Sequence, residues 1–268
     1  MKCCEWKPGA SLCFEHRFDP EFFRDMSAAG LKCAELSFTQ KDYYEKLNFL
    51  ENAPKIAADA EAAGIELWSI HLPFSGLLDI SQGDAEKRAS TIRIHKELMA
   101  AAAKVGVKVA VVHPSAEPIA DDDRPARLAM SKQKLTELAA YAKELGMRLA
   151  VENLPRSCLI RNSDEALYMF EDNPDLYMVF DTNHCLMQDN TEFVSIVGEH
   201  IISLHVSDYD FIDERHQLPF DGKNDWKSII TALENKGYCG PWMYEVGSEG
   251  GKYTLKDLYE NYRRLAAL

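Results

Sequence analysis

The sequence lacks the features of a membrane or secreted protein. No apolar run approaches the 18 or more residues that a membrane-spanning helix needs, and the N-terminal stretch MKCCEWKPGASL has no continuous apolar segment typical of a secretory signal. The seven cysteines are an odd number, lie scattered along the chain and form no CxxC pair of a zinc ribbon. We therefore expect a cytoplasmic protein with no disulfide framework and no membrane partner.

Positive charge and phosphate-binding motifs are also scarce. The formal net charge is −13, and the richest basic segments, residues 86–97 and 127–137, are interleaved with acids. Such a chain repels phosphate backbones, so we expect no nucleic-acid partner. No glycine occurs in SLCFEHRFDPEF, where a doubly wound nucleotide-binding sheet would carry its glycine-rich fingerprint. The absence of a phosphate cradle favours an unphosphorylated substrate.

Strand-like and helix-like segments alternate about eight times, and no Pro/Gly/Ser-rich linker or charge block divides the 268 residues. The pattern predicts an α/β fold, a (β/α)8 TIM barrel that forms a single domain over residues 1–268. The first strand is expected at residues 11–16 and the first helix from Pro20. An open, doubly wound sheet is the alternative. One long irregular stretch, residues 208–225, is expected to be a functional loop.

The expected strands end on histidines or carboxylates, as in IELWSIHLP, VKVAVVHPS, RLAVENLP, YMVFDTNH, ISLHVSD and GPWMYEVG. In a barrel the carboxyl ends of all strands meet at one face, so ligands distant in sequence can converge. An ion pair or a helix cap would explain any one of these residues alone. Four on successive strands favour a divalent cation (Mn²⁺, Mg²⁺, Co²⁺ or Zn²⁺), because unpaired buried carboxylates are costly. The four expected metal ligands are Glu152, Asp181, His205 and Glu245.

Other polar residues extend this ring. His184 follows Asp181 closely and is expected to reach a substrate hydroxyl or a second metal, and His71 and His113 end two further strands. In the long loop, Arg215 and His216 resemble a substrate clamp, since a guanidinium and an imidazole can bind neighbouring oxygens. A barrel-rim histidine that bonds a neighbour and a solvated charged loop are the simpler alternatives. The expected substrate-binding residues are His184, Arg215, His71, His113 and His216, while His16 stays undecided and His95 and His200 are expected to be structural.

The ordered motifs VVHP, VENLP, FDTNH, LHVSD, ERHQLPFDG and YEV resemble the xylose-isomerase-like barrel superfamily, which includes sugar isomerases and epimerases and the endonuclease IV class. The resemblance to the epimerases implies one divalent metal on Glu152, Asp181, His205 and Glu245, with the two glutamates as the acid/base pair. The endonuclease pattern implies two further ions, one on His71, His113 and Glu152 and one on His184, Glu214 and His216. The chain departs from the ketose 3-epimerases in the NLPRS run after Glu152, and from the endonucleases in having Glu214 where they prefer aspartate.

These observations lead to a metal-dependent sugar isomerase or epimerase as the main hypothesis, with proton transfer through a cis-enediolate next to a carbonyl. The expected partner is a small carbohydrate, and a homo-oligomer is compatible with the resemblance. Two other activities stay open at this point: a trinuclear zinc phosphodiesterase of the endonuclease IV type, and a dehydratase of polyol ketones that uses the same enolate chemistry. A barrel that binds sugar without catalysis is a further alternative.

Overall fold

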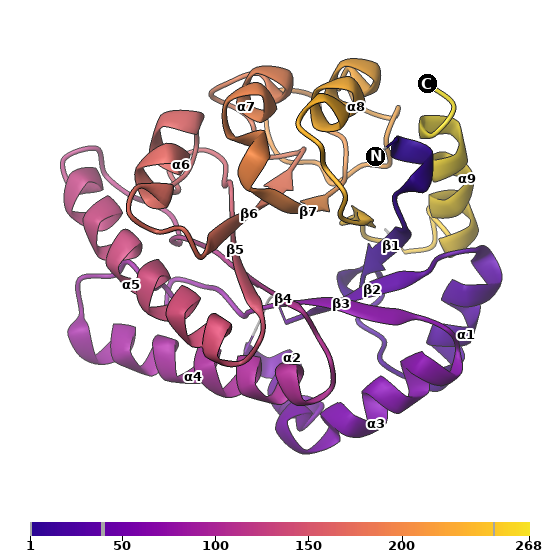
Figure 1. Cartoon of the computed structure of the whole chain (residues 1–268), viewed down its shortest axis with the longest axis horizontal. Helices are drawn as coiled ribbons and strands as arrows, with labels where there is room; N and C mark the ends of the chain where they lie inside the picture. The colour runs from indigo at the N-terminus through magenta and orange to yellow at the C-terminus, as the bar shows by residue number, and fades with distance from the viewer. Residues whose placement is uncertain (1, 39–40, 249) are drawn as a thin grey trace.

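The computed structural model describes residues 2–38, 41–248 and 250–268 and shows a TIM barrel of parallel strands surrounded by helices (Figure 1). The strands pair in the order β7-β6-β5-β4-β3-β2-β1-β8. Backbone bonds from Val206 N to Met243 O (2.8 Å) and from Glu245 N to Val206 O (3.1 Å) link the chain after β7 to β8. The strands are β1 (Pro8–Ser11), β2 (Cys33–Ser37), β3 (Glu66–His71), β4 (Val109–Val112), β5 (Arg148–Glu152), β6 (Leu176–Asp181), β7 (Ile201–His205) and β8 (Trp242–Tyr244). The fold class predicted from the sequence is confirmed.

The first strand lies earlier than expected. β1 pairs with both neighbouring strands over Pro8–Ser11, whereas Leu12–Phe14 form a short 3-10 helix, so the prediction of a strand at residues 11–16 is wrong. The buried Leu12 and Phe14 alternate as strand residues would, but they pack from a turn, in which His16 N donates to Leu12 O. Gly9 lies within this strand, and the position has no room for a side chain, which would collide with Sγ of Cys33 on β2.

The helices begin and end at local signals in the sequence. Before α1, the Asp19 carboxylate accepts bonds from the backbone of Glu21 and Phe22, Pro20 occupies the first turn, and Gly30 ends the helix at φ +107°. The helices are α1 (Pro20–Ala29), α2 (Lys41–Lys46), α3 (Phe49–Ala62), α4 (Ala85–Lys104), α5 (Arg124–Glu144), α6 (Ser163–Phe170), α7 (Asn190–Val197), α8 (Trp226–Asn235) and α9 (Leu255–Leu265).

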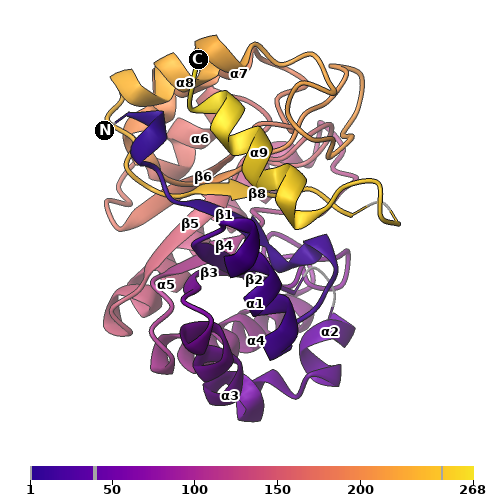
Figure 2. The ribbon, with the colours of Figure 1, turned by 90° about the vertical axis from the view of Figure 1, so that its right-hand side faces the viewer.

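The two ends of the chain lie side by side (Figure 2). Tyr262 on α9 donates its hydroxyl to Trp6 O (2.7 Å), and Cys3 N donates to Glu234 on α8 (2.8 Å). The N-terminal segment therefore packs against the last two helices and supports the junction of β1 with β8.

Strand periodicity places the polar residues at the barrel mouth. Val109, Val111, Ala150 and Val179 form a small buried cluster apart from the main core. Because side chains alternate along a strand, Glu152 on β5 and Asp181 on β6 lie on the same face as Ala150 and Val179, two residues nearer the carboxyl end. The apolar barrel interior thus changes to carboxylates and imidazoles at the C-terminal end of the strands.

None of the helices among the described residues combines the length and apolar character needed to cross a bilayer. The cysteines whose side chains the structure describes are all free thiols: Cys3, Cys13, Cys33, Cys158, Cys185 and Cys239.

Candidate active site

Four strands bring the predicted metal ligands together. Glu152, Asp181 and His205 are the last residues of β5, β6 and β7, and Glu245 directly follows β8. All four are buried, and one donor atom from each lies within 4.8 Å of the others. His205 Nδ1 is 3.1 Å from Glu152 Oε1 and 3.2 Å from Glu245 Oε2. We call these four residues the central group.

Two further donor groups flank the central group. In the first, His71 Nε2 and His113 Nε2 lie 3.1 and 3.3 Å from Glu152 Oε2. The two oxygens of Glu152 therefore face different groups, Oε2 the pair of histidines and Oε1 the central His205. This arrangement is that of a carboxylate able to bridge two cations.

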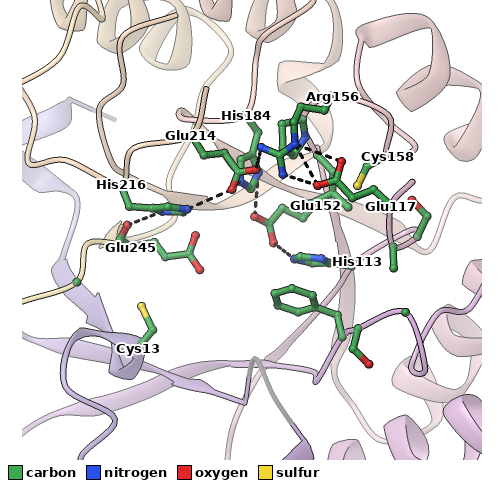
Figure 3. A pocket seen from close by; sticks show the side chains of 18 of the residues that line it. Cys13, His113, Glu117, Glu152, Arg156, Cys158, His184, Glu214, His216 and Glu245 are labelled. Atoms are coloured by element: carbon green, nitrogen blue, oxygen red, sulfur yellow. Dashed lines mark hydrogen bonds and ion pairs between the residues drawn. The ribbon is translucent and has the colours of Figure 1, made fainter. Parts of the chain in front are cut away.

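The second flanking group lies on the other side of the cavity. Glu214 Oε2 is 3.6 Å from His184 Nε2 and 3.5 Å from His216 Nε2 (Figure 3). Glu214 and His216 come from the long loop after β7, and His184 follows β6. The structure thus brings together all the histidines and carboxylates that the sequence nominates as ligands.

Hydrogen bonds fix which nitrogen each imidazole presents to these groups. Nδ1 of His71, His184 and His216 lies against a backbone carbonyl, that of Leu72 (3.0 Å), Asn153 (2.9 Å) and Glu245 (3.2 Å) respectively. An imidazole that donates from Nδ1 presents the lone pair of Nε2, which is the atom that faces the donor group in each case. In this orientation each of the three rings would offer Nε2 to a cation once that nitrogen has lost its proton.

The central group fits a cation on a second observation. Among the described residues, Asp181 Oδ2 and His205 Nδ1 are fully buried and make no hydrogen bond of acceptable geometry. His205 Nδ1 lies against the carboxylates of Glu152 and Glu245, and Asp181 belongs to the same group of donors. Buried polar atoms are normally satisfied, so this pair indicates a missing partner of positive charge.

The pKa shifts of the cation-free site also indicate that the cluster needs positive charge. Burial, with the nearby charges of Glu245 and Glu152, raises the pKa of Asp181 to about 8. Burial lowers the pKa of His184, but the carboxylates of Asp181, Glu214 and Glu152 outweigh it and raise the pKa to about 10. Without a cation, protons on imidazoles and carboxyls supply the positive charge that the cluster needs.

A cavity of about 560 Å³ opens above these groups (Figure 3). Glu152, Glu245, His113, His184, Glu214 and His216 line it. Asp181 and His205 do not line the cavity and are completely buried. Within the central group, therefore, only the two glutamates reach the space that a substrate would occupy.

Arg215 lies elsewhere. Its half-exposed guanidinium pairs with Asp210 at 2.8 Å, and it is not among the residues that line the cavity. Its predicted role as a substrate clamp has no support from this geometry. Arg156 instead borders the cavity and makes ion pairs with Glu117, Asp213 and Glu214.

Sequence reasoning missed other residues of the site as well. Phe74 lines the cavity and stacks on His113 with ring centroids 3.6 Å apart. Glu35 is buried in β2 and contacts His205. A lone carboxylate in the apolar strand CAELS was the available signal for Glu35, and the Arg in NLPRS for Arg156.

The long loop is anchored on one buried carboxylate. Asp208 accepts bonds from the backbone of Phe220 (2.9 Å) and Asn224 (3.0 Å) and from Trp226 Nε1 (2.9 Å). Gly222 passes so close to this carboxylate that a side chain there would collide with it. The anchored loop carries Glu214 and His216, so Asp208 connects loop structure to the second flanking group.

We expect Asp208→Ala to destabilise the protein by roughly 2–4 kcal/mol, because it leaves several buried donors without an acceptor. Chemical denaturation measures this loss. Asp225→Ala in the same loop removes only the exposed cap of α8, so it is the matched control, with an expected loss of about 1 kcal/mol. Equal losses in the two variants would contradict the anchoring role of Asp208.

Comparison with known proteins places this geometry in a family. The family model described as "Xylose isomerase-like TIM barrel" matches residues 23–266. An uncharacterized protein of Methanocaldococcus jannaschii is 24% identical over 202 residues, which cover 72% of this chain and 69% of that protein. Fructoselysine 3-epimerase of Escherichia coli is 25% identical over 120 residues, covering 42% of this chain and 44% of that enzyme.

A solved structure extends the likeness over the whole fold. The crystal structure of a D-tagatose 3-epimerase-like protein superposes with a TM-score of 0.79 at 20% identity, covering 97% of each chain. At that identity the superposition speaks for the fold alone. The family match spans nearly the entire barrel, from α1 to α9, and includes every strand end that carries a donor. The chain belongs to the xylose isomerase-like TIM barrel family.

Proposed function

We propose that the protein is a divalent-metal-dependent epimerase or isomerase of a sugar or a small hydroxy-carbonyl compound. One observation carries the proposal: Glu152 and Glu245 belong to the same donor group, flank His205, and are its only members that line the cavity. Two carboxylates at one substrate site can remove a proton next to a carbonyl and return it, on the same or the opposite face of the carbon. Such transfer passes through a cis-enediolate.

Each residue of the central group then has a role. Asp181 and His205, buried below the cavity, would hold the cation together with the two glutamates. When bound, the cation would polarise the substrate carbonyl and stabilise the negative charge that develops on its oxygen. Glu152 and Glu245 would take and return the proton, from β5 on one side and from the end of β8 on the other. Epimerisation uses a base on each face of the carbon, and isomerisation needs one.

Other cavity residues would position the substrate. His184 and His216 offer imidazoles near the central group, and Phe74 offers an apolar face against the carbon skeleton. Positioning of this kind lowers the entropic part of the barrier. The similarity to fructoselysine 3-epimerase, although it spans less than half of that enzyme, supports a ketose-type substrate.

A screen of unphosphorylated ketoses and aldoses in D2O with Mn²⁺, Co²⁺, Mg²⁺ or Zn²⁺ tests the proposal. We expect one deuterium from solvent to enter the carbon skeleton of a substrate, at the carbon next to the carbonyl, and only with metal present. Mass spectrometry and proton NMR follow the exchange. Absence of exchange with every sugar and metal would contradict the proposal. A product that is one water lighter than its substrate would indicate the dehydratase instead, because the proton removed from the carbon then leaves with a hydroxyl group as water.

A trinuclear phosphodiesterase is the second candidate, favoured by the two flanking groups and by the bridging position of Glu152. It predicts three zinc ions per chain and cleavage of DNA at abasic sites, with binding that weakens as salt rises. The net charge of −13 opposes it, as do the carboxylates of Glu117 and Asp213 around Arg156 at the edge of the cavity. Elemental analysis and a cleavage assay on abasic DNA distinguish the two candidates.

A further inference from the structure

Glu35 is a buried carboxylate outside every donor group described above. It lies in the middle of β2, is 0% exposed, and neighbours Ser11 on β1 and Ser69 on β3 in the strand register. Ser69 Oγ donates to Glu35 Oε2 at 2.8 Å. A carboxylate is costly to bury, so its position in the barrel interior calls for a strong partner.

That partner comes from the opposite side of the barrel. His205 Nε2 on β7 lies 3.0 Å from Glu35 Oε1 and 3.2 Å from Oε2. Because Nε2 donates to Glu35, Nδ1 is left to face Glu152 and Glu245 in the central group. The contact with Glu35 thus determines which ring nitrogen of His205 the central group receives, namely Nδ1.

His205 differs in this respect from the other histidines. Nδ1 of His71, His184 and His216 contacts backbone carbonyls, which are neutral acceptors. His205 contacts a carboxylate instead. A carboxylate that accepts a hydrogen bond from an imidazole makes that imidazole a stronger ligand and holds the ring in place. The direct contact of Glu35 is therefore with the histidine of the central group.

We propose that Glu35 is a positioning residue that orients His205 and strengthens its bond to the cation of the central group. The inference rests on the proposed metal site and is independent of the sugar chemistry. Ser69 holds the carboxylate from the adjacent strand, so Ser69, Glu35 and His205 form a relay of contacts across the barrel interior that ends at the cation.

Metal binding without substrate tests this role. The host for every titration carries His113→Ala and His216→Ala, which leave both flanking groups incomplete and the central group intact. With Mn²⁺ as the probe, we expect Glu35→Gln to weaken binding by about 10–100-fold, the usual effect of losing a carboxylate behind a ligating histidine. Glu165→Gln, which alters a buried carboxylate paired with Arg124, should leave Mn²⁺ affinity unchanged.

A second measurement excludes a purely structural effect. In the zinc-loaded host, we expect the proton on His205 Nε2 to resonate far downfield because it is hydrogen-bonded to a carboxylate, and to move upfield in Glu35→Gln.

Circular dichroism checks the fold of each metal-free variant. If Glu35→Gln does not fold, Glu35→Asp replaces it. This variant keeps the carboxylate but places it farther from His205, so it should weaken Mn²⁺ binding to an intermediate degree. Unchanged affinity in the folded Gln or Asp variant, or an unmoved Nε2 proton, would overturn the proposal. Since no turnover is measured, failure of the sugar assay leaves this result standing.

Discussion

Glu152→Gln is expected to reduce turnover by about 10²–10⁴-fold, the contribution of a positioned general base. The amide cannot accept a proton, and its neutral oxygen is a weaker ligand than the carboxylate. Glu152 is also the residue whose two oxygens face two donor groups, so the same change affects the central group and the group of His71 and His113 together. The measurement is kcat for the sugar identified by deuterium exchange, at increasing metal concentration.

Asp181→Asn separates the loss of a base from the loss of a ligand. Asp181 belongs to the central group but does not line the cavity, so it can hold the cation and cannot reach the substrate. Its variant should need more metal and then recover most of its turnover. Glu152→Gln should stay slow at saturating metal. Glu117→Gln is the matched control, since Glu117 lines the cavity outside every donor group. Full recovery of Glu152→Gln with added metal would remove Glu152 from the acid/base role.

The contrast between Glu152 and Asp181 shows what the sequence could and could not predict. Apolar strands that end on His205, Asp181 and Glu152 predict convergence, because a parallel barrel gathers all strand ends at one face. Which of these side chains reaches the cavity depends on the depth of each strand in the barrel. Strand register sets that depth, and it shifts between Met178 and Val179 and between Ala34 and Glu35. Such bulges leave no mark in the pattern of apolar residues.

Residues outside the strand-end pattern were harder to find. Leu12 and Phe14 alternate as a strand does, yet they belong to a 3-10 turn because β1 ends at Ser11. Arg156 borders the cavity through a left-handed backbone turn at φ +50°, which no residue type in NLPRS announces. Arg215 was favoured from its place beside His216, but it pairs locally with Asp210. Which acidic residue an arginine pairs with depends on the tertiary structure, and the spacing of residues in the sequence does not show it.

Removal of metal should lower both activity and thermal stability. The central group buries three carboxylates around one imidazole, and Asp181 Oδ2 and His205 Nδ1 make no hydrogen bond of acceptable geometry there. A cation that binds only the folded chain stabilises it by about 2.7 kcal/mol at a concentration 100 times its Kd. For a chain of this size that corresponds to roughly 5–10 °C in Tm. Thermal unfolding with and without excess Mn²⁺, after dialysis against chelator, measures the difference.

Variants inside and outside the central group show whether the cation that raises Tm binds there. Asp181→Asn should shrink the Tm difference between metal-loaded and metal-free protein, because it weakens the donor set that the cation completes. Asp210→Asn changes a partly exposed carboxylate that pairs with Arg215 outside the donor groups, so its Tm difference should match the wild type. If both variants kept the full difference, the stabilising cation would be bound elsewhere. A wild-type chain with the same Tm in chelator and in excess Mn²⁺, Co²⁺, Mg²⁺ or Zn²⁺ would contradict the metal site itself, because a cation that binds only the folded chain must stabilise it.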